Sequence, residues 1–365
     1  MMPVVLLQKY LSPYRVPLFN AIAATPGIDL TVLYYGAPEE RRRWTVFPGK
    51  AFAEAKASCL TFRGGYERNI DIPWSLPREL HRLRPEAVVC APDAGGIAAW
   101  FHVRSRRGRL VVWSEAIPST ETGASHPKRR LRSTIYGAAS AFAVPGELSE
   151  RYIREFRPDA RFFRTPNTTD EKLFAATPAE VERKFSADGP LLVTFSGSLI
   201  ERKGTHILVP AFRRLLDEEP SLRGRVQLRL LGTGPLDLTG AAGGGVDLLG
   251  FREGEAYSRT FRESHLFVLP SLRDNNPLTV VEALFAGNAL LLSEGCGNHP
   301  EAVRGNGAVV PAGSAERLFG AMRDLLLRPR AELAAMAQAS LLIASEFSVE
   351  RSAGGFRAAL DACVP

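Results

Sequence analysis

The stretch 270-PSLRDNNPLTVVEALFAG-287 decides the fold of this chain. The five residues before it, HLFVL at 265–269, are a short apolar run of the kind that forms a buried strand. Pro277 suits the first position of a helix, because its missing N–H would have no partner there anyway. Gly287 can end that helix in the left-handed conformation. The stretch therefore predicts a strand, a polar loop and a helix.

The polar loop and the start of the helix form a candidate site. Asn275 or Asn276 is expected to cap the helix, whose first amides can then bind an anion. Asp274 lies in the loop, and Glu282 lies on the helix eight residues further on. Two carboxylates beside an anion site repel a phosphate placed directly on them, but they suit sugar hydroxyls that lie next to a phosphate.

Apolar segments of strand length alternate with helical segments along the whole chain, which is typical of doubly wound α/β folds. In the first half we expect strands at 4–7, 30–35, 87–91, 110–113 and 141–144, and helices at 16–24, 77–83, 96–106, 128–139 and 148–156. In the second half we expect strands at 191–196, 226–231, 246–249, 266–269, 289–293 and 308–310, and helices at 207–217, 256–262, 278–286 and 315–327.

Two Rossmann-like lobes in series are therefore expected. The composition turns polar at residues 166–174, and residues 175–187 look like a linker. We place one domain at residues 1–175 and the other at residues 176–345, followed by a last helix near 349–362. The first turn of the chain has no Gly-x-Gly-x-x-Gly, which argues against a nicotinamide or flavin dinucleotide site.

The composition is that of a globular protein, with 45% hydrophobic and 23% charged residues among 365. No run of about 18 apolar residues predicts a membrane-spanning helix. The apolar start lacks the basic leader of a signal peptide and is interpreted as a first strand. The four cysteines are scattered without a Cys-x-x-Cys pair, which indicates buried free thiols in a reducing cytoplasm.

Positive charge is concentrated in the N-terminal half. Residues 1–178 contain 26 Lys and Arg against 17 Asp and Glu, a net charge of +9. The net charge of the whole chain is +7, so the remaining residues carry a net charge of −2. The basic residues cluster at 41–43, 104–109 and 128–132. Such clusters either form a solvated face or attract anionic lipid headgroups or an anionic acceptor. No nucleic-acid-binding module is present, so nucleic acid is not an expected partner.

A second loop carries two adjacent cations. Gly197 and Ser198 follow the strand at 191–196, and Arg202 and Lys203 come just before a helix. Ligands of open α/β sheets bind at the carboxyl ends of the strands, where a guanidinium fork and an ammonium group suit a diphosphate. Such a pair alone is usually surface charge, but together with the anion-ready helix it favours a diphosphate site. Gly232 turns the chain after another strand and needs no ligand to explain it.

These motifs together resemble the donor-binding domain of retaining glycosyltransferases with the GT-B fold, the family 4 type. The resemblance covers about residues 190–310 and rests on residues 197–204, 231–235, 249–251 and 274–287, in the family's order. It implies two lobes facing a central cleft and a C-terminal helix that crosses back, so that residues 346–365 join the first lobe. It also implies transfer of a sugar from a nucleotide diphosphate sugar with retention at the anomeric carbon.

The resemblance implies a role for each matching residue. Glu282 matches the second glutamate of the family's Glu-x7-Glu motif, which binds the nucleotide ribose, and Asp274 falls on the first, which holds sugar hydroxyls. Arg202 and Lys203 match the diphosphate clamp, and Phe251 lies where backbone groups meet the base. The predicted donor-binding residues are Gly197, Ser198, Gly232, Phe251, Asn275, Asn276, Pro277 and Leu278.

The sequence departs from the family pattern at several points. An aspartate replaces the first glutamate, and Asn275-Asn276-Pro277 replaces the commoner Gly-Phe-Gly turn, so the donor sugar stays open. The chain has no Asp-x-Asp, the short metal site of the other glycosyltransferase fold. We therefore expect no metal and no cofactor other than the donor substrate itself.

The first lobe is expected to bind the acceptor. Residues 12–19 resemble the opening of many bacterial family members, where this loop faces the crevice. Arg15 there either holds an acceptor or donor phosphate or caps the surface of the lobe. Glu115 follows a strand where many relatives have a histidine near the reacting sugar, and it takes either a polar role in the site or an ordinary strand-end salt bridge.

The sequence thus predicts a metal-independent glycosyltransferase that uses a UDP- or GDP-sugar and a glycan or lipid-linked acceptor. Its expected role is bacterial cell-surface polysaccharide biosynthesis, in the cytoplasm at the inner face of the plasma membrane. A catalytically silent nucleotide-sugar-binding scaffold and a nucleotide-sugar epimerase of the same shape are the alternatives.

Overall fold

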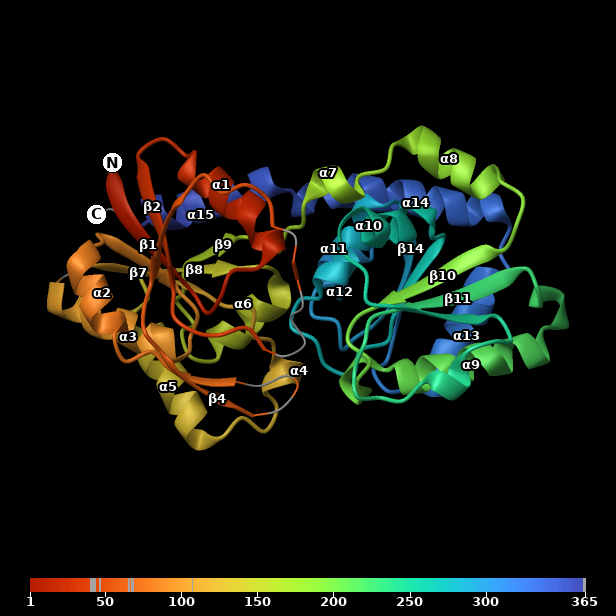
Figure 1. Ribbon diagram of the computed structural model, residues 1–365, viewed down its shortest axis with the longest axis horizontal. Coiled ribbons are helices and arrows are strands. Elements are labelled where there is room, and N and C mark those ends of the chain that lie inside the picture. Colours follow the sequence, from red (N-terminus) through yellow and green to blue (C-terminus); the bar gives the residue numbers. More distant parts are fainter. Residues whose placement is uncertain (40–43, 46, 65, 67–68, 107, 364–365) are drawn as a thin grey trace. The chain divides into compact units, whose positions relative to one another are not determined.

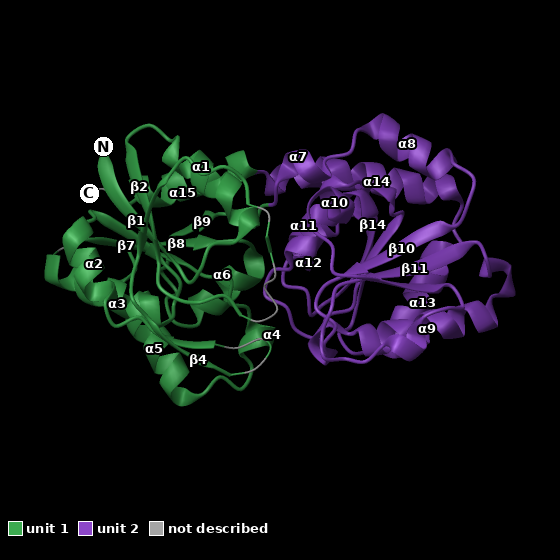
Figure 2. Ribbon diagram, in the orientation of Figure 1, with its two compact units in different colours: residues 1–168, 349–365 green, residues 169–348 purple. Residues whose placement is uncertain are grey.

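The computed structural model describes residues 1–39, 44–45, 47–64, 66, 69–106 and 108–363. The chain forms two compact units, residues 1–168 with 349–365 and residues 169–348 (Figure 2). These bounds differ by several residues from the expected domain limits at 175 and 345. The basic cluster at residues 41–43 lies outside the described residues.

The first unit is built on a parallel seven-stranded sheet with the order β3-β2-β1-β6-β7-β8-β9. Its central strands are apolar and buried because helices cover both faces. The strands are β1 (Met2–Gln8), β2 (Ile28–Tyr34), β3 (Ala53–Lys56), β6 (Ala87–Cys90), β7 (Arg109–Trp113), β8 (Ala141–Val144) and β9 (Phe162–Arg164). An antiparallel hairpin of β4 (Leu60–Arg63) and β5 (Asn69–Ile72), which the sequence did not predict, stands apart from this sheet.

The helices of the first unit form two layers (Figure 1). Helices α1 and α15 pack together on one face, and α2, α3 and α5 lie on the other. In chain order the helices are η1 (Pro13–Arg15), α1 (Val16–Ala23), α2 (Leu76–Leu83), α3 (Ala94–Arg106), α4 (Pro118–Glu121), α5 (His126–Ala138), α6 (Glu147–Arg154) and α15 (Val349–Asp361). The buried ring of Phe356 on α15 meets Trp113 edge-on at 4.8 Å between centroids. The expected return of the C-terminal helix to the first lobe is confirmed.

The second unit contains a parallel six-stranded sheet with the order β12-β11-β10-β13-β14-β15. Its strands are β10 (Leu191–Ser196), β11 (Val226–Leu231), β12 (Val246–Gly250), β13 (Leu266–Leu269), β14 (Ala289–Ser293) and β15 (Gly307–Val310). Numbered within the unit, this order reads 3-2-1-4-5-6, which is that of a Rossmann fold. All six strands lie where the apolar runs predicted them.

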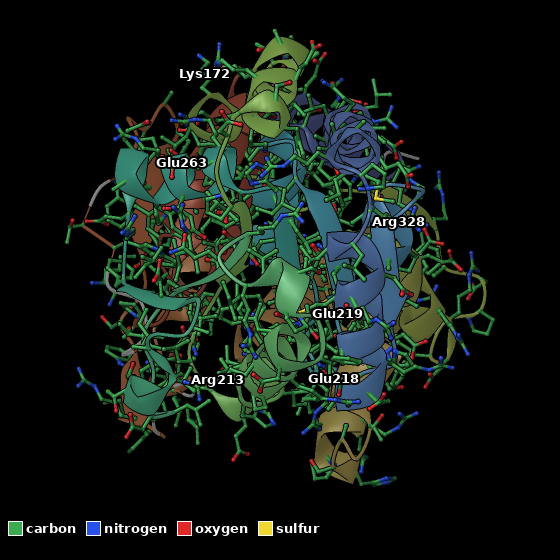
Figure 3. The ribbon with its side chains drawn as sticks, turned by 90° about the vertical axis from the view of Figure 1, so that its right-hand side faces the viewer. Lys172, Arg213, Glu218, Glu219, Glu263 and Arg328 are labelled. Carbon is green, nitrogen blue, oxygen red and sulfur yellow. The ribbon has the colours of Figure 1, made fainter. Side chains whose placement is uncertain are left out.

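Helices cover both faces of this sheet as well. Helices α9 and α13 pack together on one face, and α8, α10, α11 and α14 lie on the other (Figure 1). The helices are α7 (Glu171–Phe174), α8 (Pro178–Ser186), η2 (Glu201–Lys203), α9 (Thr205–Glu218), η3 (Pro220–Leu222), η4 (Thr239–Ala241), α10 (Gly254–Glu263), α11 (Leu278–Phe285), α12 (His299–Ala302), α13 (Ala315–Leu326), α14 (Arg330–Ala344) and η5 (Ser345–Phe347). Several charges on the outer surface are paired, as in Glu219 with Arg323 at 2.8 Å (Figure 3 labels Glu219).

The expected linker at residues 175–187 is wrong, because most of it forms helix α8. Thr177 and Glu180 form a capping box in which each side chain bonds the backbone N–H of the other residue. Val181 and Phe185, four residues apart, bury one face of the helix. The polar composition of this segment therefore reflects a surface helix.

The cysteines are free, as expected, although only Cys90 and Cys296 are buried, whereas Cys59 and Cys363 are half-buried. In the described part of the chain, no helix is long and apolar enough to cross a membrane.

Candidate functional site

The two loops singled out in the sequence meet at one point of the second sheet. Strands β10 and β13 are neighbours in the sheet but not in the chain, so the connections leaving them run to opposite sides. In open α/β sheets this switch point, outside the carboxyl ends of the strands, is where ligands bind. Residues 197–204 follow β10, and residues 270–277 follow β13.

Backbone hydrogen bonds fix the loop after β13 between its neighbours. The N–H of Leu272 donates to the carbonyl of Arg202 at 2.8 Å. The N–H of Asp274 donates to the carbonyl of Gly295 at 2.7 Å, and the N–H of Gly297 donates to the carbonyl of Asp274 at 2.8 Å. Asp274 is therefore held in place by its backbone on both sides of the loop.

Two glycines are required where these loops approach each other. Gly204 has a φ of +78°, and a Cβ there would lie 2.1 Å from the carbonyl oxygen of Pro270. A Cβ at Gly232 would lie 1.9 Å from the carbonyl oxygen of Gly197. A side chain at either position would separate the loops. Gly232 thus has a packing role between two strand ends.

Arg202, Lys203 and Asp274 come together in the structure. The Lys203 ammonium group forms a salt bridge with Asp274 Oδ2, and both side chains are largely buried. Arg202 Nη1 donates to the carbonyl of Arg273 at 2.8 Å and lies 4.0 Å from Asp274 Oδ1. Two cations face one carboxylate, so the cluster has an excess positive charge suited to an anion.

Glu282 lies on α11 with only 6% of its surface exposed. The hydroxyl of Tyr257, on α10, donates to Glu282 Oε2 at 2.7 Å, and the Tyr257 and Ser196 hydroxyls are hydrogen-bonded at 3.0 Å. Burial raises the pKa of Glu282 to about 7, although hydrogen bonds from Tyr257 and Thr169 oppose this shift. A chain of hydroxyls therefore links the end of β10 to this carboxyl.

The sequence reasoning missed Tyr257, Ser196 and Thr169. The three residues come from separate segments of the chain, and no spacing connects them to Glu282. The only signal was Ser196, a polar residue that ends an otherwise largely apolar strand.

The start of α11 differs from the prediction. Pro277 itself is the N-cap residue, with φ −65° and ψ 117°, and the helix begins at Leu278. Because Pro277 and not an asparagine occupies the N-cap position, and Pro277 makes no side-chain cap bond, the expected N-cap at Asn275 or Asn276 is wrong. The carbonyl of Pro277 instead accepts a hydrogen bond from the side-chain amide of Asn298 at 3.0 Å, which holds the turn from outside.

Other predicted features of this segment agree with the structure. Gly287 has a φ of +61° directly after the C-cap of α11, as expected of the residue that ends the helix.

In the described part of the chain, the buried amide oxygen of Asn275 has no hydrogen-bond partner. The loop before α11 therefore contains a hydrogen-bond acceptor, the amide oxygen of Asn275, that a donor group of a ligand could satisfy.

The remaining donor-side residues lie at the same edge of the sheet. Gly197 and Ser198 directly follow β10. Phe251 follows β12, two strands away from β10, and its ring is 42% exposed. An exposed aromatic ring at the carboxyl edge of a sheet offers a flat apolar surface to a ligand.

The two acceptor-side candidates meet in the first unit. Arg15 Nη2 pairs with Glu115 Oε1 at 2.6 Å, and Arg15 Nη1 donates to Asn167 Oδ1 at 3.0 Å. The guanidinium carbon also lies 4.2 Å from the ring centroid of Trp113. Of the two roles predicted for Glu115, a polar role in the site and a salt bridge at the end of a strand, the structure contains the salt bridge.

Among the residues that the structure describes, no group of three or more His, Cys, Asp or Glu side chains is placed to hold a metal ion. The independence from metal expected from the sequence stays a prediction.

Comparison with known proteins indicates a glycosyltransferase fold. Residues 190–328 match the family model described as Glycosyl transferases group 1, and the whole chain has the two-lobed GT-B fold of glycosyltransferases. The resemblance predicted from the sequence is confirmed for the fold of the whole chain and for residues 190–328. A comparison with curated protein sequences gives no match.

Three solved structures illustrate the likeness of the fold. HepE from Anabaena, solved in complex with UDP and glucose, is 15% identical with a TM-score of 0.72, over 99% of this chain and 100% of HepE. Sucrose-phosphate synthase from Thermosynechococcus elongatus is 16% identical with a TM-score of 0.73, over 99% and 98% of the two chains. A trehalose-6-phosphate synthase, studied for glycosyl transfer with retention, is 12% identical with a TM-score of 0.68, over 98% of each chain.

Proposed function

We propose that the chain is a retaining glycosyltransferase that moves a sugar from a UDP- or GDP-sugar to a glycan or lipid-linked acceptor. The observation that carries this proposal is the meeting of Arg202, Lys203 and Asp274 at the switch point of the second sheet. Cations suit the diphosphate of such a donor, and a carboxylate suits its sugar hydroxyls. The second unit is then the donor lobe and the first unit the acceptor lobe.

The chemical role of the cations is to stabilise the leaving group. Cleavage of the bond between sugar and phosphate leaves negative charge on the nucleoside diphosphate. Arg202 and Lys203, with the amides at the start of α11, would stabilise that charge as it develops. Fixed positive groups of the protein would do here what a divalent cation does in metal-dependent transferases.

The carboxylates would position the donor. A bound diphosphate would attract the ammonium group of Lys203, so that Asp274 exchanges this partner for hydroxyls of the donor sugar. Glu282 would accept hydrogen bonds from the ribose, and the exposed ring of Phe251 would lie beside the base.

In the proposed route to retention, the acceptor hydroxyl would attack on the face that the diphosphate leaves, and its proton would pass to the leaving phosphate oxygen. This route uses no nucleophile of the protein. It is supported by the likeness in fold to the trehalose-6-phosphate synthase studied for transfer with retention.

The acceptor and the cellular setting follow from charge and from the likeness to bacterial enzymes. A basic first unit suits an enzyme on the inner face of a bacterial plasma membrane that works in cell-surface polysaccharide biosynthesis. The salt bridge of Arg15 with Glu115 would lie on the acceptor side.

The proposal is tested by the slow hydrolysis of UDP- and GDP-sugars by the purified chain. We expect release of nucleotide by the wild type and a loss of at least about 100-fold in the Arg202→Ala and Lys203→Ala variants. Arg328→Ala, which removes an exposed arginine paired with Glu332 in the same unit, is the matched control (Figure 3 labels Arg328).

The same assay separates the alternatives. A catalytically silent scaffold releases no nucleotide from any donor, and an epimerase converts the free nucleotide sugar into its epimer without releasing nucleotide. Normal turnover in both variants would contradict the proposed clamp.

A further inference from the structure

The β4–β5 hairpin of the first unit has its polar face turned inward. Asp71 has a side chain that is only 3% exposed, and it pairs with Lys9 Nζ at 2.7 Å. The hydroxyl of Thr61, directly opposite on the other strand, donates to Asp71 Oδ1 at 2.7 Å. The polar residues of the two strands are therefore attached to the body of the unit.

The other face of the hairpin is apolar and points to solvent. Leu60 lies opposite Ile72 and Phe62 lies opposite Ile70, and these four side chains are 49–64% exposed. Trp74, two residues after β5, is 63% exposed. A hairpin in water normally buries its apolar face and exposes its polar one. This hairpin does the opposite, which marks a contact surface.

Further exposed apolar side chains lie on helix α3 of the same unit. Helix α2 begins just after Trp74, with its N-cap at Ser75, and packs against α3. On α3, Ile97 and Phe101 are spaced four residues apart, so they lie on the same side of the helix, and they are 38% and 59% exposed.

Three arginines without an acidic partner in the described part of the chain lie on helices α2 and α3, although Arg106 is hydrogen-bonded to His81 at 2.9 Å. Arg78 lies on α2, and Arg104 and Arg106 lie on α3; within the described residues, none of the three forms a salt bridge with an acidic side chain. Some arginines elsewhere in the chain are paired, as in Arg229 of the second unit with Glu263 at 3.0 Å (Figure 3 labels Glu263). Exposed apolar and aromatic side chains beside arginines are typical of proteins that lie on anionic membranes.

We infer that the outward face of the β4–β5 hairpin, together with Trp74, is the surface by which this protein binds an anionic lipid bilayer. The apolar side chains enter the headgroup region, and the arginines of α2 and α3 bind the anionic headgroups. The inference names the contact surface of the membrane association proposed above, and it rests on that part of the proposed function.

The test measures co-sedimentation of the full chain with vesicles of phosphatidylcholine alone and of phosphatidylcholine with phosphatidylglycerol. We expect binding to the anionic vesicles, weakened by salt, and a loss on the order of tenfold in a Phe62→Ser, Ile70→Ser double variant. Leu342→Ser is the matched control, because Leu342 on α14 of the second unit is 77% exposed. Tryptophan emission should shift to the blue on binding, and Trp74→Phe should remove most of that shift.

Several outcomes would overturn the inference. These are no binding of the wild type to anionic vesicles, equal binding by the double variant, and a dimer that depends on the hairpin without any binding to vesicles. The last outcome would assign the surface to a second copy of the chain.

Nucleotide binding, followed separately by a thermal-shift assay, distinguishes a failure of this inference from a failure of the donor chemistry. The double variant should bind nucleotide like the wild type. Vesicle binding without any nucleotide binding would support this surface and contradict the donor site.

Discussion

Glu282, which we propose to bind the ribose of the donor, is also a source of instability. Its carboxyl is buried, and burial raises its pKa from 4.5 to about 7. The folded chain therefore holds this proton more tightly than the unfolded chain does. The stability that this proton provides is fully present below about pH 4.5 and is lost as the pH rises through about 7. At neutral pH the Glu282 carboxyl is therefore close to the midpoint of its ionisation, because its pKa is about 7.

This linkage predicts that Glu282→Gln stabilises the second unit at high pH. We expect a gain of about 2 kcal/mol at pH 8 and almost none at pH 4, because the amide carries no charge to bury. Urea unfolding at the two pH values measures the difference. A gain of the same size at both would show that burial of charge is not the cause. Affinity for nucleotide should fall in the same variant.

Helix α11 is the element on which the proposed donor site depends, and it is held at both ends. Asn298 bonds the carbonyl of Pro277 at its start, and Lys184 Nζ of α8 donates to the carbonyls of Ala286 and Gly287 at its end, at 3.2 and 2.8 Å. The segment interpreted as a linker therefore holds α11 in place.

Gly287→Ala tests this anchoring. The left-handed φ and a Cβ that would lie 2.5 Å from Val181 Cγ2 should together cost about 2 kcal/mol of stability. Gly320→Ala on α13 is the control, because its Cβ would meet open space and the change should be neutral or slightly stabilising. Thermal unfolding measures both, and equal melting temperatures for the two variants would contradict this account.

Among the helices and strands, the sequence predicts some elements well and others poorly. Buried parallel strands are short apolar runs, and therefore β10, β13 and β14 were predicted close to their observed bounds. The hairpin β4–β5 is not predicted because each of its strands has only four residues, of which two are apolar. In the site, Arg202, Lys203 and Asp274 could be predicted to meet because they follow adjacent strand ends. Tyr257 could not, because its contact with Glu282 depends on how α10 packs on α11.

The division of the molecule into two units determines how distant changes act. Helix α15 lies at the end of the chain but belongs to the first unit, where Phe356 is 1% exposed and packs on Trp113. All the residues proposed to bind the donor lie within residues 169–348. Stability of the first unit and nucleotide binding by the second are therefore expected to be separable.

Phe356→Ala tests this separation. Loss of the buried ring should destabilise the first unit by about 3–5 kcal/mol. Calorimetry should show an earlier transition for the first unit, while affinity for nucleotide at a temperature where the chain remains folded stays unchanged. A parallel loss of nucleotide affinity under folded conditions would show that the units do not act independently.

The most direct test of the donor site is titration calorimetry with UDP and GDP. The account predicts that the wild type binds at least one of the two, that an Arg202→Ala, Lys203→Ala double variant binds it at least about tenfold more weakly, and that Arg328→Ala binds it like the wild type. Failure of the wild type to bind either nucleotide, or equal affinity in the double variant, would contradict it.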